Sequence, residues 1–148
     1  MTQKDEIKSL KDFHFKTSIP IRFADIDMFG HANNAVYLTY FEIARTVYWK
    51  EIINWDWNTT GIIIASAEIS YLKPIRLNDE ILAYVKTISI GKTSFTLKYA
   101  LVKLVNGEEE ICTTGRTTCV AFDYMTNKPT LIPKPSRLKM ESFEALGS

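Results

Sequence analysis

Two aspartates and a histidine are crowded into a short polar stretch that directly precedes a long apolar segment. Asp25 and Asp27 are separated by one residue, and His31 follows four residues later in a glycine-containing turn. A carboxylate beside a helix start is favoured by the partial positive charge there, and carboxylates and imidazoles commonly act as general bases. One aspartate could instead cap the turn, and the histidine could serve turn hydrogen bonding, so spacing alone leaves both interpretations open.

Asn33 and Asn34 stand where the apolar segment begins and where a helix is expected to start. The amide oxygen of either side chain can accept a hydrogen bond from the free backbone N–H groups of the first helical turn. With an asparagine in that role, at least one of the two preceding aspartates lacks an obvious structural task.

Glu42 is a third candidate because it lies on an otherwise apolar helix. A buried carboxylate costs free energy unless it is paired or used in chemistry. Arg45 follows three residues later and can reach it across one helical turn. An ion pair and a role in the site are therefore both kept open.

Three basic residues, Lys73, Arg76 and Lys92, lie at the ends of predicted strands. Each could contact a phosphate group of a substrate. Strand ends also carry basic residues simply because they are solvated, so the pattern alone does not separate the two interpretations.

Other kinds of catalytic centre lack their residues in this chain. Two histidines and no nucleophile-elbow glycine pattern argue against a Ser-His-Asp triad. No paired Cys/His spacing predicts a metal site and no glycine-rich loop predicts a nucleotide site, so we expect no cofactor. Cys112 and Cys119 are expected to be reduced packing residues, because seven residues of strand separate them far beyond disulfide reach.

One helix and five strands are expected to position these residues. Residues 13–24 predict a first strand in which Pro20 marks an edge or an irregularity. Residues 35–54 predict a helix about 30 Å long that is apolar on most sides, and such a helix is normally buried.

The pattern after residue 60 is that of strands in hairpin-like succession. Four further strands are expected at 61–72, 80–90, 94–105 and 110–122, with Asn106-Gly107 as a strong hairpin turn. The odd positions of the last strand are mostly small, as a sheet face pressed against a thick helix would be. The tail from Asp123 onward contains three prolines and is expected to be irregular, with a short helix near its end.

Length and composition fit one domain with its own core. The 148 residues are 46% hydrophobic, and we expect a polar N-terminal segment at 1–12 and a single domain at 13–148. The net charge of +1 gives no reason to expect nucleic acid as a partner. Neither a signal-peptide pattern nor a run of ~20 apolar residues occurs, which predicts a cytoplasmic protein without a membrane span.

The motifs as a whole resemble a known family of enzymes. The residues that carry the resemblance are Arg22-Phe23-Ala24-Asp25-Ile26-Asp27, then Gly30-His31-Ala32-Asn33-Asn34 and Tyr37, and the segment Tyr40-Phe41-Glu42-Ile43-Ala44-Arg45. They are similar to the hotdog-fold thioesterases of the 4-hydroxybenzoyl-CoA thioesterase-like class, over roughly residues 13–124. The resemblance implies an α+β hotdog fold, in which an antiparallel five-stranded sheet wraps around one long central helix. It also implies pairing with a second copy through the sheets, as a homodimer or homotetramer.

The resemblance implies hydrolysis of an acyl thioester to a free acid and a thiol. In that family the second aspartate of the Asp-x-Asp run is catalytic, as nucleophile or general base, and this position is Asp27. The backbone N–H at the start of the central helix, here Asn34, polarises the thioester carbonyl, as a helix N-terminus can. His31 is expected to orient the site, and Glu42 to bind water or to hold the helix in place.

Acyl-CoA is the expected substrate, with three alternatives. The His31-x-Asn-Asn pattern is closer to plant-type acyl-carrier-protein thioesterases, but Phe29 and Pro74 stand where those enzymes carry polar site residues. An acyl-carrier-protein thioesterase and a non-catalytic acyl-CoA-binding hotdog domain are therefore kept as alternatives. A hydratase of this fold is less favoured, because its catalytic histidine differs in position from His31.

Overall fold

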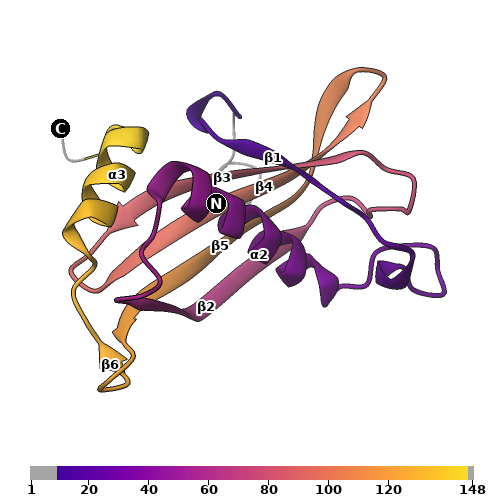
Figure 1. Ribbon diagram of the computed structural model, residues 1–148. Coiled ribbons are helices and arrows are strands. Elements are labelled where there is room, and N and C mark those ends of the chain that lie inside the picture. The colour runs from indigo at the N-terminus through magenta and orange to yellow at the C-terminus, as the bar shows by residue number, and fades with distance from the viewer. Residues whose placement is uncertain (1–9, 147–148) are drawn as a thin grey trace.

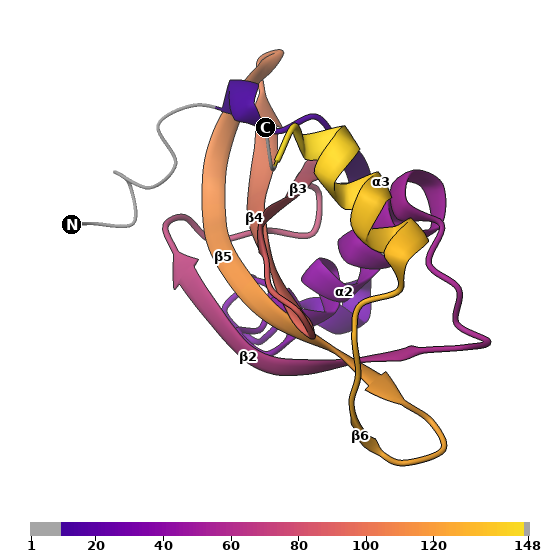
Figure 2. The same cartoon turned by 90° about the vertical axis from the view of Figure 1, so that its left-hand side faces the viewer.

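One long helix lies in the hollow of a single curled antiparallel sheet (Figures 1 and 2). The computed structural model describes residues 10–146. The helices are α2 (Val36–Tyr48) and α3 (Lys134–Glu144), with the short helical turns η1 (Leu10–Asp12), η2 (Phe23–Asp25) and η3 (Trp49–Ile53). The strands are β1 (Lys16–Ile19), β2 (Gly61–Tyr71), β3 (Ile81–Ile90), β4 (Ser94–Val105), β5 (Glu108–Asp123) and β6 (Lys128–Pro129). The predicted α+β architecture, a sheet wrapped around one central helix, is confirmed.

The strand order is β1-β3-β4-β5-β2, and the two-residue β6 pairs with β5. β3, β4 and β5 follow one another as hairpins, and Asn106-Gly107 forms the predicted two-residue turn between Val105 and Glu108. The expected hairpin succession is wrong at its first step, because β2 pairs with β5 rather than with β3. β5, with 16 residues, pairs with β4 along one edge and with β2 along the other. β2 therefore forms one edge of the sheet.

The predicted helix at 35–54 is present as α2 running directly into the π-helical turn η3. It ends where Asn54 adopts a left-handed conformation with φ of 55°. The apolar sides are buried as expected, and the ring of Phe41 stacks on that of Tyr99 with 4.2 Å between centroids. A Cβ at Gly115 would lie 2.4 Å from the Phe41 ring, so this position of β5 must stay glycine. The helix α2 thus packs against the face of β5 that carries mostly small residues, as the sequence predicted.

The first strand and the C-terminal tail differ from the prediction. The strand expected at 13–24 is reduced to β1, because Pro20 follows Ile19 and cannot donate to a ladder. The tail contains an 11-residue helix, α3, which is longer than expected. Residues 1–9 of the predicted N-terminal segment lie outside the described residues, and the domain boundaries stay a prediction.

α3 is docked by a buried carboxylate. Glu144 Oε2 accepts hydrogen bonds from Tyr48 Oη at 2.6 Å and from the backbone N–H of Thr87 at 2.9 Å. These two contacts fasten the C-terminal helix to the end of α2 and to β3, at the end of the molecule seen beside the label α3 in Figure 2. Among residues 10–146, no helix is long and apolar enough to span a membrane.

Both cysteines are free and buried, as predicted. Burial raises the pKa of each thiol, Cys112 and Cys119, to about 11. A thiol with so high a pKa is almost entirely protonated near neutral pH, so neither is an activated nucleophile. The two residues serve packing.

Candidate functional site

The loop between η2 and α2 folds back on itself and is tied to the connection that follows β2. The N–H of Asp27 donates to the His31 carbonyl at 2.8 Å, and the N–H of Ala32 donates to the Ile75 carbonyl at 2.7 Å. Gly30 makes the reversal with φ of 82°, a left-handed conformation that favours glycine. The loop thereby brings Asp27 and His31 against the end of β2.

Asp25 is the structural member of the aspartate pair. It is 2% exposed, and its Oδ1 accepts from Arg22 Nε at 3.0 Å and Nη2 at 2.7 Å. Its Oδ2 accepts from the Arg22 backbone N–H at 2.9 Å and from Tyr40 Oη at 3.0 Å. Burial by itself would raise the pKa of Asp25, but the hydrogen bonds from Arg22 and Tyr40 outweigh it and hold that pKa below its ordinary value.

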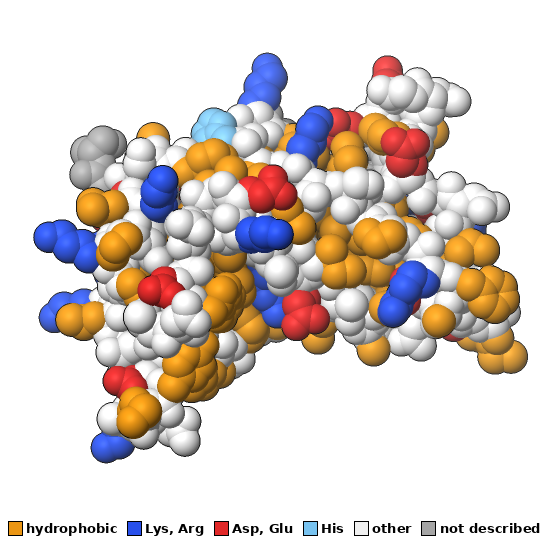
Figure 3. Space-filling view, in the orientation of Figure 1, with side chains coloured by type: hydrophobic (Ala, Val, Ile, Leu, Met, Phe, Trp, Pro, Cys, Tyr) orange, Lys and Arg blue, Asp and Glu red, His pale blue; other side chains and the backbone are white. Residues whose placement is uncertain are grey.

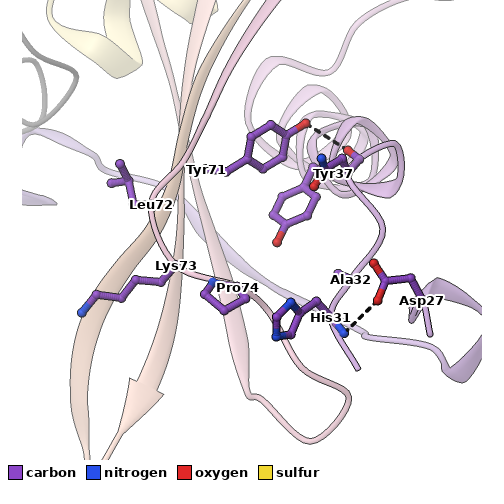
Figure 4. Close-up of a pocket in the computed structure, with 9 residues that line it drawn as sticks. Asp27, His31, Ala32, Tyr37, Tyr71, Leu72, Lys73 and Pro74 are labelled. Atoms are coloured by element: carbon purple, nitrogen blue, oxygen red, sulfur yellow. Dashed lines mark hydrogen bonds between the residues drawn. The ribbon is translucent and has the colours of Figure 1, made fainter. Parts of the chain in front are cut away.

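Asp27 has one carboxylate oxygen engaged and one available. Its Oδ1 accepts from the backbone N–H of Phe29 at 2.9 Å and of His31 at 3.3 Å. Its Oδ2 makes no hydrogen bond within the part of the chain that the structure describes. The side chain is partly exposed and stands at the wall of a cavity (Figure 4). A carboxylate fixed through one oxygen and free at the other can take a proton from a water molecule.

This cavity has a volume of about 310 Å³ and lies between the start of α2 and the end of β2. It is open on one side, and both polar and aromatic side chains contribute to its wall. The lining residues are Asp27, His31, Ala32, Asn34, Tyr37, Tyr71, Leu72, Lys73 and Pro74. We refer to it below as the Asp27 pocket.

The two asparagines at the helix start have different tasks. Asn33 Oδ1 accepts from the Ala35 N–H and its carbonyl accepts from the Val36 N–H, each at 2.9 Å. Asn33 therefore supplies the capping bonds. The N–H of Asn34 makes no hydrogen bond among residues 10–146, and the Asn34 carbonyl accepts from Tyr71 Oη at 3.0 Å. A free N–H at a helix start is thus present in the Asp27 pocket.

Two tyrosines complete the pocket, and sequence reasoning did not place them there. Tyr37 and Tyr71 meet edge to face with 4.8 Å between ring centroids. Burial raises the pKa of Tyr37, and the negative charge of Asp27 adds to this effect. Tyr37 belongs to the run that carries the family resemblance, but that run alone does not place its side chain in a pocket. Tyr71 carries no local signal, because its place in the site depends on where the end of β2 lies against the helix.

The predicted basic residues are not all at the pocket. Arg76 Nη2 lies 3.4 Å from His31 Nε2, at the rim. Lys73 lines the pocket with its backbone side, but its ammonium points away in Figure 4 and pairs with Glu110 at 3.0 Å. Lys92 lies just before Ser94, the first residue of β4. Ser94 pairs with one end of β5, whereas Tyr71 pairs with a residue near the other end of β5. Within one chain, the structure therefore does not bring Lys92 to Asp27.

Glu42 is also outside the Asp27 pocket. Its side chain is 65% exposed, and its Oε2 lies 4.0 Å from Arg45 Nη2. It lines a different cavity, farther along α2. Within residues 10–146, no group of three His, Cys, Asp or Glu side chains could hold a metal ion.

Residues 21–140 match the family model described as the thioesterase-like superfamily. An uncharacterised protein of Bacillus subtilis, YsmA, is 37% identical over 117 residues, which is 78% of each chain. The long-chain acyl-CoA thioesterase FadM of Escherichia coli is 26% identical over 134 residues, covering 86% of this chain and 98% of FadM.

The fold also agrees with solved structures. A thioesterase of Thermus thermophilus, solved in complex with coenzyme A and zinc, is 30% identical and superposes with a TM-score of 0.78. The match covers 91% of this chain and 97% of the other. Together with further solved structures of the same architecture, it confirms the hotdog fold predicted from the sequence.

The different roles of Asp25 and Asp27 can be tested by measuring the stability of a variant at each position. We expect Asp25→Asn to lower the free energy of unfolding by roughly 1–3 kcal/mol, because a buried hydrogen-bond acceptor of Arg22 and Tyr40 is weakened. Asp27→Asn should cost little, since an amide oxygen can keep both turn hydrogen bonds. Urea unfolding followed by circular dichroism measures both.

The pH dependence of the free energy of unfolding supplies a second test of the roles of Asp25 and Asp27. A carboxyl group whose pKa is lowered by folding stabilises the protein above its unfolded pKa, and this contribution is lost as the pH falls through the folded pKa. The gap in stability between wild type and Asp25→Asn should therefore narrow below about pH 4. Equal stability of the two aspartate variants at pH 7 would contradict the assignment.

Proposed function

The chain belongs to the thioesterase-like superfamily, and on that premise we propose that it hydrolyses an acyl-CoA thioester to a free acid and coenzyme A. The observation that carries the proposal is the Asp27 pocket, where a carboxylate with a free oxygen shares one cavity with the unpaired N–H of Asn34. FadM, an acyl-CoA thioesterase, and the Thermus enzyme, which binds coenzyme A, support CoA as the thiol.

Asp27 acts on water or on the thioester itself. As a general base, its Oδ2 takes a proton from a water molecule whose oxygen attacks the carbonyl carbon. As a nucleophile, Oδ2 attacks that carbon directly, and water then hydrolyses the acyl-enzyme anhydride. In both routes the C–S bond breaks and the thiolate takes up the proton that water released. Both routes require the ionised carboxylate.

The start of α2 stabilises the negative charge that develops on the carbonyl oxygen. The free N–H of Asn34 is the donor, and the partial positive charge of the helix end adds to it. His31 holds the site through its backbone contacts with Asp27 and through its ring, which lies beside Arg76. We assign Glu42 to pairing with Arg45 on the helix rather than to the chemistry of this pocket.

Arg76 is the basic residue best placed to meet a phosphate of coenzyme A. It is exposed at the rim of the pocket, and among residues 10–146 its guanidinium hydrogen-bonds to the His31 ring alone, while its backbone pairs with Asp79. Lys73 would have to leave Glu110 to join it. Lys92 is left out, because it lies at the other end of the sheet.

A second copy of the chain would cover the free edge of β2. This edge strand is 11 residues long, and Ile63 on it is 49% exposed. Long unpaired edges with exposed apolar residues favour pairing with another strand. We propose a homodimer joined through β2, with a tetramer formed by contact between outer sheet faces as the alternative. The cytoplasmic location expected from the sequence stays a prediction.

Replacing the proposed base tests the mechanism. We expect Asp27→Asn to lower kcat for acyl-CoA hydrolysis by about 100- to 10,000-fold, the range expected for loss of a general base, with thiol release as the measurement. Asp123→Asn is the matched control, because Asp123 Oδ1 also accepts two turn N–H groups, from Met125 and Thr126. Full activity of folded Asp27→Asn would refute the mechanism. Saturable binding of acyl-CoA without turnover by the wild type would favour a non-catalytic binding domain.

The choice of thiol is tested through Arg76. We expect Arg76→Gln to raise KM for an acyl-CoA roughly fivefold, as for one exposed ion pair, and to leave KM for the same acyl-pantetheine unchanged. Lys92→Gln should alter neither constant. A much lower KM for the acyl-carrier-protein thioester than for the CoA thioester would favour the carrier-protein alternative, which the His31-x-Asn-Asn pattern also suggests.

A proline substitution at the β-bulge of β2 tests whether a second copy of the chain pairs with this edge strand. Ala65 stands opposite no residue of β5, so Ala65→Pro should disturb the β2–β5 ladder less than a proline elsewhere on β2, while its ring obstructs a strand added at the open edge. We expect the wild type to run as a dimer in light scattering, and this variant to dissociate at concentrations where the wild type does not. A wild-type mass of one chain would contradict the proposal.

A further inference from the structure

The two peptide groups that flank the α-carbon of Asn34 have nearly all of their polar atoms engaged. In the peptide that joins Asn33 to Asn34, the Asn33 carbonyl accepts from the Val36 N–H at 2.9 Å. In the peptide that joins Asn34 to Ala35, the Asn34 carbonyl accepts from Tyr71 Oη at 3.0 Å, and the Ala35 N–H donates to Asn33 Oδ1 at 2.9 Å. Of these four groups, the Asn34 N–H alone has no partner among residues 10–146.

These hydrogen bonds fix the direction of the free N–H. A trans peptide group is planar, and its C=O and N–H point in opposite directions. The bond from Val36 to the Asn33 carbonyl therefore aims the Asn34 N–H away from the first turn of α2, and it also polarises the peptide, which strengthens the donor. Because only two dihedral angles join neighbouring peptide groups, a bond that holds the second peptide restricts rotation of the first.

Tyr71 supplies the bond that comes from the sheet. It is the last residue of β2 and pairs there with Thr113 of β5. Its ring meets the ring of Tyr37, which is 2% exposed, edge to face with 4.8 Å between centroids. Figure 4 shows the Tyr71 hydroxyl directed at the start of α2. The orientation of the free N–H thus depends on the edge of the sheet as well as on the helix.

The contact between Tyr71 and Asn34 lies at the surface of the molecule. Hydrophobic side chains gather over α2 and β2 on the face that Figure 3 shows, and Tyr71 is 47% exposed. A hydrogen bond in such a place adds little to folding stability, because water can replace the lost partner. Loss of the Tyr71 hydroxyl should therefore change the aim of the Asn34 N–H more than it changes the fold.

We propose that Tyr71 is a positioning residue, which holds the Asn34 N–H at the angle that stabilises the oxyanion of the reaction. The proposal rests on the proposed function and adds a residue of β2 to its site. Tyr71 acts through the backbone of Asn34 rather than on the substrate. A donor of this kind works because it is already aimed where charge develops, so misalignment slows the chemical step more than it weakens substrate binding.

Tyr71→Phe tests this role, because it removes the hydroxyl and keeps the ring that packs on Tyr37. We expect kcat for acyl-CoA hydrolysis to fall about tenfold and KM to change less than about twofold, since removal of an oxyanion donor itself costs roughly 100- to 1000-fold in kcat. The pH dependence of kcat should keep its shape, because Asp27 is untouched. Tyr124→Phe is the matched control: Tyr124 is also 47% exposed, and its ring contacts Phe122, outside the Asp27 pocket. The control should match the wild type in both constants.

Two substrate analogues distinguish a positioning role from a packing role. Trifluoroacetonyl-CoA is hydrated in water to a tetrahedral carbon and resembles the transition state, whereas acetonyl-CoA keeps a planar carbonyl like that of the substrate. We expect Tyr71→Phe to weaken binding of trifluoroacetonyl-CoA about tenfold and to change the Kd of acetonyl-CoA less than about twofold. Equal losses for the two analogues, or equal kcat in Tyr71→Phe and Tyr124→Phe, would overturn the proposal.

Calorimetric titration with the two analogues needs no turnover, so it separates this proposal from the proposed function. A wild type that hydrolyses no acyl-CoA, together with a selective loss of trifluoroacetonyl-CoA binding in Tyr71→Phe, would refute the proposed function and support the positioning role. Turnover by Tyr71→Phe at the wild-type rate would leave the thioesterase function standing and refute the positioning role. Absence of both hydrolysis and the selective loss would refute both.

Discussion

The enclosure of α2 is the constraint on which the rest of the structure depends. A helix that is apolar on most of its sides is stable in water only when other elements cover those sides. The sheet meets this requirement by curling, and β5 gives it room through small residues, of which Gly115 beneath Phe41 is the tightest. Two tyrosine hydroxyls that are carried into the core are paired there with carboxylates, Tyr40 with Asp25 and Tyr48 with Glu144.

The same constraint decides which side of the helix is left for ligands. β1, β3, β4 and β5 cover the buried face, whereas β2 is an edge strand with exposed small residues at its middle. Leu38, 45% exposed, and Glu42 lie on the side of α2 that the sheet does not cover. The Asp27 pocket and the cavity lined by Glu42 therefore both occur along the line where α2 meets β2, one at each end of the helix.

Environment, rather than residue type, separates the two aspartates. Asp25 is saturated with donors, and its contact with Tyr40 joins the loop to the helix it precedes. Asp27, two residues later, is held through Oδ1 alone within residues 10–146. The hydrogen bonds of Asp25 thus fix the backbone that carries Asp27. Because the loop needs no further bond from Asp27, its Oδ2 is left available for chemistry.

The parts that the sequence predicted are those that local patterns determine. The apolar run located α2 and η3, the Asn-Gly pair located the β4–β5 turn, and the polar string located Asp27, His31 and Asn34. The pairing of β2 with β5 could not be predicted, because it joins segments about fifty residues apart by shape rather than by any local signal. The positions of Tyr71 and Lys92 relative to the Asp27 pocket depend on that pairing. Tyr71 was therefore missed, and Lys92 was expected to contact the substrate although it does not reach the pocket.

The position of Arg45 follows from helix geometry. Residues 34, 38, 42, 45 and 49 recur at intervals of three or four, so they form one stripe along α2 and its two ends. The stripe begins at the free N–H of Asn34 and ends at the unpaired indole of Trp49. The length of α2 therefore sets the separation between the Asn34 N–H in the Asp27 pocket and the indole of Trp49.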